Sequence, residues 1–135
     1  MLKAFKTEIA PNKEQNEKIV RSIGIARFLY NQYVAYNKKL YKMYQRGLLD
    51  SRQKHFVTAK DFDKYVNHNL KIKLPWIDEC GSKARKKALV NAENAFKKFF
   101  DGLAGFPRFK KKSYQDVKLY FPKNNKGDWR IWRNK

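Results

Sequence analysis

The sequence is poor in the residues that form disulfides and metal sites. It has a single cysteine, Cys80, and two histidines, His55 and His68, among 135 residues. One cysteine cannot form a disulfide within the chain, and the histidines have no sulfur or carboxylate cluster at metal-ligand spacing. We interpret Cys80 as a small buried residue and both histidines as ordinary solvent or interface residues. No metal and no other cofactor is expected in this chain.

Acidic residues are also scarce. Twelve Asp and Glu stand against 32 Lys and Arg, which leaves a formal net charge of +20. A field of that size concentrates polyanions around a protein, so nucleic acid is the leading partner class. No apolar run approaches the roughly 20 residues of a transmembrane helix, and the N-terminus lacks a signal-peptide core. We expect an intracellular protein without a membrane partner.

Catalytic motifs are missing as well. A two-metal nuclease needs several carboxylates that converge on one site, whereas the acids of this chain are scattered along it. Four of them fall at helix beginnings, where they favour the helix dipole: Asp61, Asp63, Asp78 and Glu79. The sequence contains no GxxxxGK[ST] loop, no HExxH and no serine elbow. We therefore predict that this chain by itself is not an enzyme.

The most informative stretch that is present covers residues 82–100, predicted to be an amphipathic helix with Ser82 as its N-cap. At 3.6 residues per turn its apolar side chains share one face: Ala84, Ala88, Leu89, Ala92, Ala95, Phe96, Phe99 and Phe100. The opposite face carries Lys83, Lys86, Lys87, Lys97 and Lys98, with Val90 projecting from its middle. Glu93 lies at the margin. Arg85 falls on the apolar side, from which its head is expected to extend into solvent.

A helix of this kind suggests a DNA-binding element. Lysines would hold phosphates, Val90 would contact a thymine methyl group, and the polar side chains Lys86, Lys87 or Asn94 would reach base edges in a major groove. A run of charge is more often just a solvated face. The coincidence of a lysine face, nearby basic and aromatic segments and a large excess of positive charge favours nucleic-acid binding.

The rest of the chain mixes helices with short strands. A capping box at Asn12 and Gln15 predicts a helix to about residue 46, in which Gly24 marks either a break or a close helix crossing. Thr58 predicts a second helix start, and Leu74-Pro75 ends that helix. Residues 2–9, 117–121 and 129–132 read as strands. The expected fold class is therefore α+β.

Aromatic and basic residues also meet outside the lysine face. Residues 106–109, followed by three lysines, are expected to be extended, and phenylalanines there could stack on bases. Arg108, Phe109, Lys110, Lys111 and Lys112 are therefore candidate contacts for nucleic acid.

Several motifs in order resemble one family. They are AFKTEIAPNKEQNEKI, IGIARFLYNQYV, LPWI, a serine-initiated helix that ends in NAFKKFF, and AGFPRFKKK. Together they cover nearly the whole chain and resemble the N-terminal region of TnpB proteins, the OrfB-type, transposon-encoded relatives of compact type V CRISPR effectors. Each motif alone would be weak, whereas their order and spacing make the match specific.

The resemblance implies a helical recognition domain inserted into a split β-barrel wedge domain. Residues 1–11 would form the first barrel strand, residues 12–102 the helix-turn-helix-like recognition bundle, and residues 103–135 the return to an incomplete barrel. Family members are RNA-guided DNA endonucleases, which places such a protein in a prokaryotic cytoplasm, near the nucleoid. The RuvC-type nuclease half, with its acidic triad and four-cysteine zinc element, would lie beyond Lys135.

The resemblance also implies roles for particular residues. Guide RNA and double-stranded DNA would be the partners, with base pairing reading the target and protein reading a short adjacent motif. Ser82, Lys86 and Lys87 would face that motif, with Thr58 nearby, so the candidate DNA-binding set is Thr58, Ser82, Lys83, Lys86, Lys87, Val90 and Asn94. Lys86 and Lys87 stand where family helices commonly carry glutamine. The segment from Arg108 to Lys112 would more readily face RNA, so the candidate RNA-binding set is Arg27, Tyr30, Arg108, Phe109, Lys110, Lys111 and Lys112. For Arg27 and Tyr30, core packing is an equally good reading.

Two other functions fit the same residues. One is a stand-alone helix-turn-helix regulator or transposase accessory protein, which would dimerise on paired half-sites. The other is a structural RNA-binding protein of ribosomal style. Co-purification of an RNA of defined length favours the TnpB-like reading, whereas RNA-free dimers on a palindrome favour the regulator.

Overall fold

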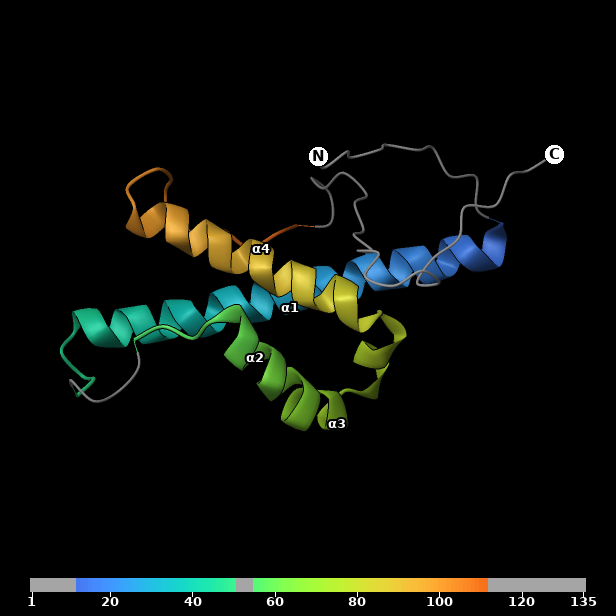
Figure 1. Ribbon diagram of the computed structural model, residues 1–135, viewed down its shortest axis with the longest axis horizontal. Coiled ribbons are helices and arrows are strands. Elements are labelled where there is room, and N and C mark those ends of the chain that lie inside the picture. The colour runs from blue at the N-terminus through green and yellow to red at the C-terminus, as the bar shows by residue number, and fades with distance from the viewer. Residues whose placement is uncertain (1–11, 51–54, 112–135) are drawn as a thin grey trace, which may run out of the picture.

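The computed structural model describes residues 12–50 and 55–111 (Figure 1). Its first element is the long helix α1 (Lys13–Gln45). The predicted capping box is confirmed, because the Asn12 side chain accepts a hydrogen bond from the Gln15 backbone N–H at 2.8 Å and the Gln15 side chain accepts one from the Asn12 N–H at 3.1 Å. Gly24 neither breaks the helix nor marks a close crossing, since a Cβ there would only meet the Arg27 guanidinium at 3.8 Å.

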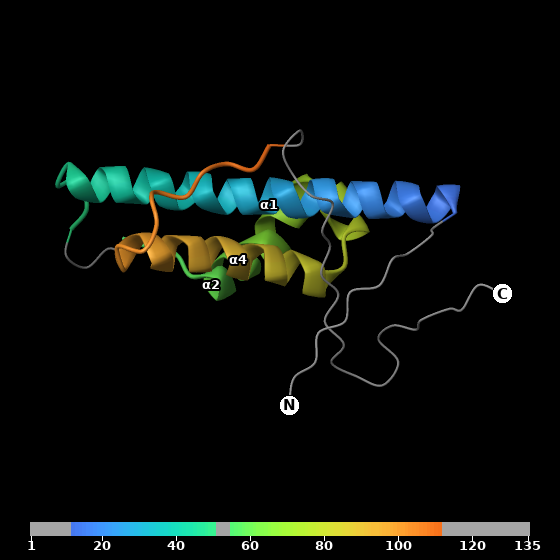
Figure 2. The same ribbon diagram turned by 90° about the horizontal axis from the view of Figure 1, so that it is seen from above.

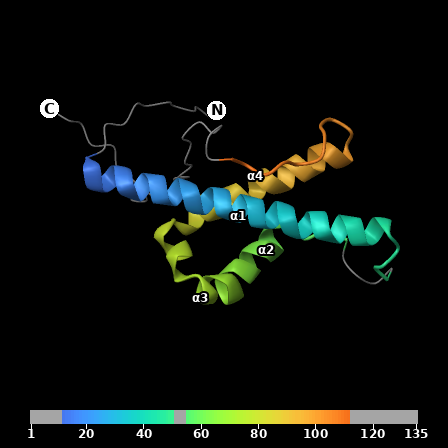
Figure 3. The ribbon, with the colours of Figure 1, turned by 180° about the vertical axis from the view of Figure 1, so that it is seen from behind.

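The remaining helices form a return arm and a second long helix. The arm consists of α2 (Ala59–Tyr65), a π-helical turn η1 (Val66–Leu70) and the short α3 (Lys71–Lys73). A 3-10 turn η2 (Pro75–Glu79) then leads into α4 (Ser82–Phe100). As Figures 1 and 3 show, α1 and α4 run side by side in the same direction, and the arm of α2 and α3 lies along one flank of the pair.

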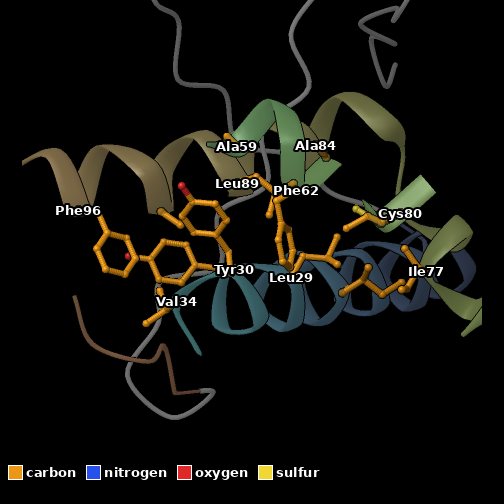
Figure 4. Close-up of a cluster of buried hydrophobic side chains, with 14 residues drawn as sticks. Leu29, Tyr30, Val34, Ala59, Phe62, Ile77, Cys80, Ala84, Leu89 and Phe96 are labelled. Carbon is orange, nitrogen blue, oxygen red and sulfur yellow. The ribbon is translucent and has the colours of Figure 1, made fainter. Parts of the chain in front are cut away.

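The buried side chains of the described residues form one hydrophobic core between α1, α2, η2 and α4. In Figure 4, side chains from α1, among them Leu29 and Val34, share this space with Phe62 of α2 and Phe96 of α4. The Tyr33 ring, which is fully buried, lies edge-on to both phenylalanines, with ring centroids at 5.4 and 6.0 Å. Cys80 is also fully buried, as predicted. The apolar face of α4 therefore forms one wall of the core, which fixes the direction of its opposite face.

A buried polar network ties the connection before α2 to α1. The Asn37 side chain accepts a hydrogen bond from the Val57 N–H at 2.8 Å and donates one to the Val57 carbonyl at 3.2 Å. The Tyr33 hydroxyl donates to the same carbonyl at 2.7 Å. Because buried backbone groups without partners are costly, Asn37 and Tyr33 hold this connection where a neighbouring strand would otherwise be needed.

The α+β prediction is wrong, because the described residues form helices and contain no strand. Residues 106–111 were expected to begin the returning barrel strands. They are non-helical, but Pro107 has no N–H to donate to a neighbouring strand. The Lys110 N–H donates to the Asn31 side-chain oxygen at 2.8 Å, and the Asn31 side-chain nitrogen donates to the Lys110 carbonyl at 3.0 Å. A helix side chain therefore takes the place of a partner strand. The other expected strands, at residues 2–9, 117–121 and 129–132, lie outside the described residues.

The described helices begin at Lys13 and end at Phe100. The division into residues 1–11, 12–102 and 103–135 stays a prediction.

The Tyr33 hydroxyl predicts a specific pH dependence of stability. Burial, and to a lesser extent the nearby Glu93 carboxylate, raises the pKa of Tyr33 well above its usual value. The folded chain then keeps this proton above pH 10, where the unfolded chain loses it, so stability falls as pH rises through that range, by at most about 1.4 kcal/mol per pH unit.

Tyr33→Phe removes both the hydroxyl and its titration. We expect the variant to be less stable than the parent by about 1 kcal/mol at pH 8, because a buried hydrogen bond is lost. The difference should shrink between pH 10 and pH 11, since only the parent loses stability through Tyr33. Urea unfolding at pH 8, 10 and 11 measures both effects. A gap that stays constant across this range would contradict the prediction.

Candidate nucleic-acid interface

The outer face of α4 carries a stripe of cationic and small polar side chains. We name it the α4 stripe and define it by Lys83, Lys86, Lys87, Val90, Asn94, Lys97 and Lys98. Lys86, Asn94, Lys97 and Lys98 are exposed, and Lys83 and Lys87 are half-buried. Val90 keeps 38% of its surface exposed, although it is apolar and lies in the middle of this face. The predicted lysine face of this helix is confirmed as an outer face.

The helix start differs from the prediction by one residue. Gly81 is the N-cap, and Ser82 is the first helical residue, exposed and without a capping role. Serine was expected to cap because its hydroxyl can accept from the first turn, but here the backbone already turns at Gly81. Ser82 therefore stands at the exposed beginning of the stripe with its hydroxyl not used for capping.

Arg85 does not extend into solvent as predicted. It is only 4% exposed, and its Nη1 lies 2.6 Å from the Cys80 carbonyl oxygen and 3.4 Å from that of Ile77. The same nitrogen pairs with Asp78 at 3.4 Å. The guanidinium points into the turn before α4, where it is the side-chain donor to the Cys80 carbonyl and a second donor to the Ile77 carbonyl, which also accepts from the Cys80 N–H. Arg85 therefore fixes how α4 leaves the turn.

Glu93 is the acidic residue of α4, and it is already engaged. Its carboxylate accepts a hydrogen bond from the Ala59 N–H, the first donor of α2, at 2.6 Å and pairs with Lys97 at 3.1 Å. A carboxylate at a helix N-terminus is a favourable contact. This contact brings Thr58 beside the middle of α4. The Thr58 hydroxyl itself caps α2 by accepting from the Asp61 N–H at 3.3 Å. Thr58 therefore lies next to the Glu93 side of α4, at the margin of the α4 stripe.

The candidate RNA-binding residues divide into two groups. Tyr30 is 8% exposed and belongs to the core, with the Lys110 Nζ 4.4 Å from its ring centroid. Burial raises the pKa of its hydroxyl. Arg27 is half-buried on α1, whereas Arg108, Phe109, Lys110 and Lys111 are exposed. Lys112 lies outside the described residues. The structure thus favours the core-packing reading for Tyr30 and leaves the exposed segment 108–111 as the accessible group.

The two basic regions lie on different elements. The α4 stripe lies opposite the buried face of α4. Residues 105–111 lie along α1 itself, on the opposite side of α1 from α2 (Figure 2). Asn91, which was not among the predicted site residues, is exposed at the edge of the stripe. The same helical periodicity that revealed Lys87 would have found it, because the two residues are four apart.

The described part of the chain contains neither a metal-binding cluster nor a membrane-spanning helix. Among residues 12–50 and 55–111, no three His, Cys, Asp or Glu side chains gather in the way a metal ion needs. Within those same ranges, no helix is both long enough and apolar enough to cross a bilayer.

Comparison with known proteins supports the resemblance found in the sequence. Residues 1–46 match the family model of the helix-turn-helix domain of IS605 OrfB proteins. The described part of this match is one uninterrupted helix, α1, without a turn inside it. The chain is 27% identical over 119 residues to InsQ of Escherichia coli (strain K12), whose name describes a candidate RNA-guided DNA endonuclease.

The coverage of the relatives differs. The InsQ match takes in 88% of this chain but spans only 28% of the length of InsQ. A second relative, virulence protein VsdF of Salmonella dublin, is 31% identical over 116 residues, which cover 83% of this chain and 95% of VsdF. The motif order, the family-model match and these two similarities agree, and the chain belongs to the IS605 OrfB family of TnpB-type proteins.

Proposed function

We propose that this chain is the nucleic-acid-binding portion of a TnpB-like protein and that α4 contacts duplex DNA through the α4 stripe. The observation that carries the proposal is the charge balance of α4. Its acidic residue, Glu93, is held by α2 and Lys97, so Lys86 and Lys98 remain exposed on a face without a competing carboxylate. Phosphates are the natural counterions of such a face.

The geometry of the stripe suits a major groove. An α-helix fits that groove, and lysines at the edges of the stripe would contact phosphates while the centre faces the bases. Val90 and Asn94 occupy the centre, one helical turn apart. A valine methyl group fits against the thymine methyl, and an asparagine amide pairs with adenine. Ser82 and Thr58 would then lie where the duplex passes the beginnings of α4 and α2.

The finer assignment follows the family. Duplex recognition would serve a short transposon-adjacent motif, and the exposed residues Arg108 to Lys111 would contact a guide RNA, as the name of InsQ suggests for that relative. Catalysis would belong to a RuvC-type region of a longer protein and not to the residues described here. Purification tests this assignment: an RNA of defined length that survives a moderate salt wash is expected to accompany the chain.

A stand-alone helix-turn-helix regulator is the alternative, and the match of residues 1–46 to a helix-turn-helix domain favours it. Such a protein would dimerise on paired half-sites about 10 base pairs apart. RNA-free dimers that protect a palindrome would support the regulator and contradict the TnpB-like assignment.

The double variant Lys86→Gln/Lys98→Gln tests the duplex proposal. Each lost phosphate contact is expected to reduce the steepness of the salt dependence by about 0.9 in a plot of log K against log salt concentration, or about 1.8 in total. Fluorescence anisotropy with a labelled duplex measures this slope. The matched control, Lys13→Gln/Lys18→Gln, removes the same charge from the exposed first turns of α1 and should leave the slope nearly unchanged. Equal effects of the two pairs would reject the stripe as the contact surface.

Base reading requires a separate test. Selection of bound duplexes from a random library should give a preferred sequence, and Val90→Ala, Lys86→Ala or Lys87→Ala should change the preference at one or two positions. A good base contact contributes about 1–3 kcal/mol of discrimination. If these variants lose affinity equally for every sequence, their side chains contact phosphates only.

A further inference from the structure

A groove runs along the outer side of α1, beneath the segment that follows α4. It consists of two adjoining hollows of about 400 and about 430 Å³ that share Lys38 and Phe109. The first is lined by Ala35, Lys38, Lys39, Lys42, Met43, Arg46 and Phe109, and the second by Val34, Lys38, Gly105, Phe106, Pro107, Arg108 and Phe109. The Phe109 ring stands between the hollows and is accessible from both.

The Phe109 ring is held in place by its neighbours on both sides along the chain. After it, the Lys110 backbone is bonded twice by the Asn31 side chain. Before it, Pro107 is buried and Phe106 packs against Tyr41, with ring centroids 5.8 Å apart. Phe109 itself keeps 49% of its surface exposed, and the Lys38 Nζ lies 5.6 Å from its ring centroid. An anchored backbone with an exposed aromatic ring forms a stacking platform whose position is set before a ligand arrives.

The groove is strongly cationic. The sequence has no Asp or Glu between Glu17 and Asp50. Within the described residues, no carboxylate forms an ion pair with the cations that line the first hollow, which are Lys38, Lys39, Lys42 and Arg46. Arg108 adds a further cation at the second hollow. The floor between these cations is apolar, with Ala35, Met43 and Phe109. The groove thus has an aromatic face and an apolar floor, with cationic side chains around them.

We propose that this groove binds the nucleotides of a single strand, with a base stacked on Phe109 and its phosphates on Lys38, Lys39, Lys42 and Arg46. The ligand chemistry is an aromatic ring joined to phosphates. A duplex cannot supply it, because its bases are stacked on one another and their faces are closed. The proposal deepens the RNA-contacting part of the proposed function and rests on it. It adds the α1 cations, which no sequence motif had marked.

Phe109→Leu and Lys39→Gln/Lys42→Gln separate stacking from charge. The assay is an anisotropy titration of the full chain with a labelled 15-nucleotide uridine oligomer. Phe109→Leu should weaken binding about tenfold, because the variant loses the aromatic face on which a base stacks. The slope of log K against log salt concentration should not change, because the variant loses no charge. The lysine pair should reduce the slope by about 1.4, or about 0.7 for each phosphate contact on a single strand. Phe109→Trp should bind at least as tightly as the parent and report stacking by fluorescence quenching.

The controls use exposed residues away from the groove. Lys60→Gln/Lys64→Gln removes two charges from α2 and should leave the slope unchanged. Circular dichroism checks that each variant keeps its helices. Unchanged single-strand binding by Phe109→Leu would overturn the stacking site, and an equal slope change in the α2 pair would overturn the phosphate contacts.

Two further measurements identify the source of the nucleotide and keep the two proposals apart. In the first, uridine triphosphate competes with the labelled oligomer for the chain. Displacement of the oligomer at similar concentrations would identify a free nucleotide as the ligand, and weak displacement would identify a polymer. Either result supports the groove if Phe109→Leu weakens the binding of that ligand. The same variants are also titrated with duplex DNA. Failure of the groove would leave the duplex effect of Lys86→Gln/Lys98→Gln intact, whereas failure of the duplex proposal would leave the Phe109→Leu effect intact.

Discussion

Phe96→Ala is expected to lower the free energy of unfolding by about 4 kcal/mol, the largest effect of any single substitution considered for this protein. Phe96 is 1% exposed, and its ring contacts three separate parts of the fold. The ring centroids lie 6.0 Å from Tyr33 on α1, 5.5 Å from Phe56 before α2 and 5.5 Å from Phe106 after α4. Replacing a buried phenylalanine by alanine removes its burial energy and leaves a cavity, which typically costs 3–5 kcal/mol.

Urea unfolding followed by circular dichroism measures this loss. Phe100→Ala is the matched control, because Phe100 lies four residues further along α4 and is 52% exposed. It should cost less than half as much. Phe96→Ala should also free Phe106, and through it the segment that carries Phe109. Comparable losses from the two alanine variants would mean that the core is not centred on Phe96.

Arg85→Met is expected to lower the free energy of unfolding by about 2 kcal/mol. Methionine fills a similar volume, but it leaves the Cys80 carbonyl without its donor, and a buried unsatisfied group costs about 1–3 kcal/mol. The Ile77 carbonyl loses one of two donors and keeps the Cys80 N–H at 3.2 Å. Asp78 keeps its pair with Lys71 at 3.2 Å, so its charge is not left alone. Arg85→Lys should recover part of the loss, since an ammonium can still donate to Cys80.

The same substitution should also affect α4, the helix proposed to contact DNA. With the turn released, backbone amides in η2 and the first turns of α4 should exchange hydrogen faster, and sequence preference in duplex binding should weaken. Arg21→Met is the control. Arg21 is exposed and pairs with Glu17 and Glu79 at 4.0 and 3.6 Å, and such surface pairs contribute about 0–1 kcal/mol. An Arg85→Met variant as stable as Arg21→Met would show that the turn does not depend on the guanidinium.

Short-range sequence patterns, namely helix caps and hydrophobic periodicity, predicted most of the helices. The capping box at Asn12 and the N-cap at Thr58 were predicted from residue types three positions apart and are confirmed. The two faces of α4 followed from its periodicity, which also placed Val90 outward. These predictions succeed because caps and helix faces depend on residues within one or two turns of each other.

The predictions that failed concern partners far away along the chain. Periodicity placed Arg85 on the apolar face but could not show that inward carbonyls of the preceding turn would receive its guanidinium. The segment after α4 was predicted to be extended, and the family resemblance placed it in a β-barrel. Nothing in its sequence reveals that the Asn31 side chain, 79 residues away from Lys110, binds its backbone. The groove on α1 was missed for the same reason. Its cations and Phe109 come together only when that segment lies along the helix.

By itself the sequence determined the excess of positive charge, the helices with their caps and the family to which the chain belongs, since these depend on composition, short-range contacts and motif order. Tertiary structure decided which charges are accessible. It buried Arg85, occupied Glu93 with the start of α2, covered Tyr30 with Lys110 and left Phe109 exposed among lysines. The physical reason is that the energy of a charge or a ring is set by the groups packed around it, and packing brings together residues that the sequence keeps apart.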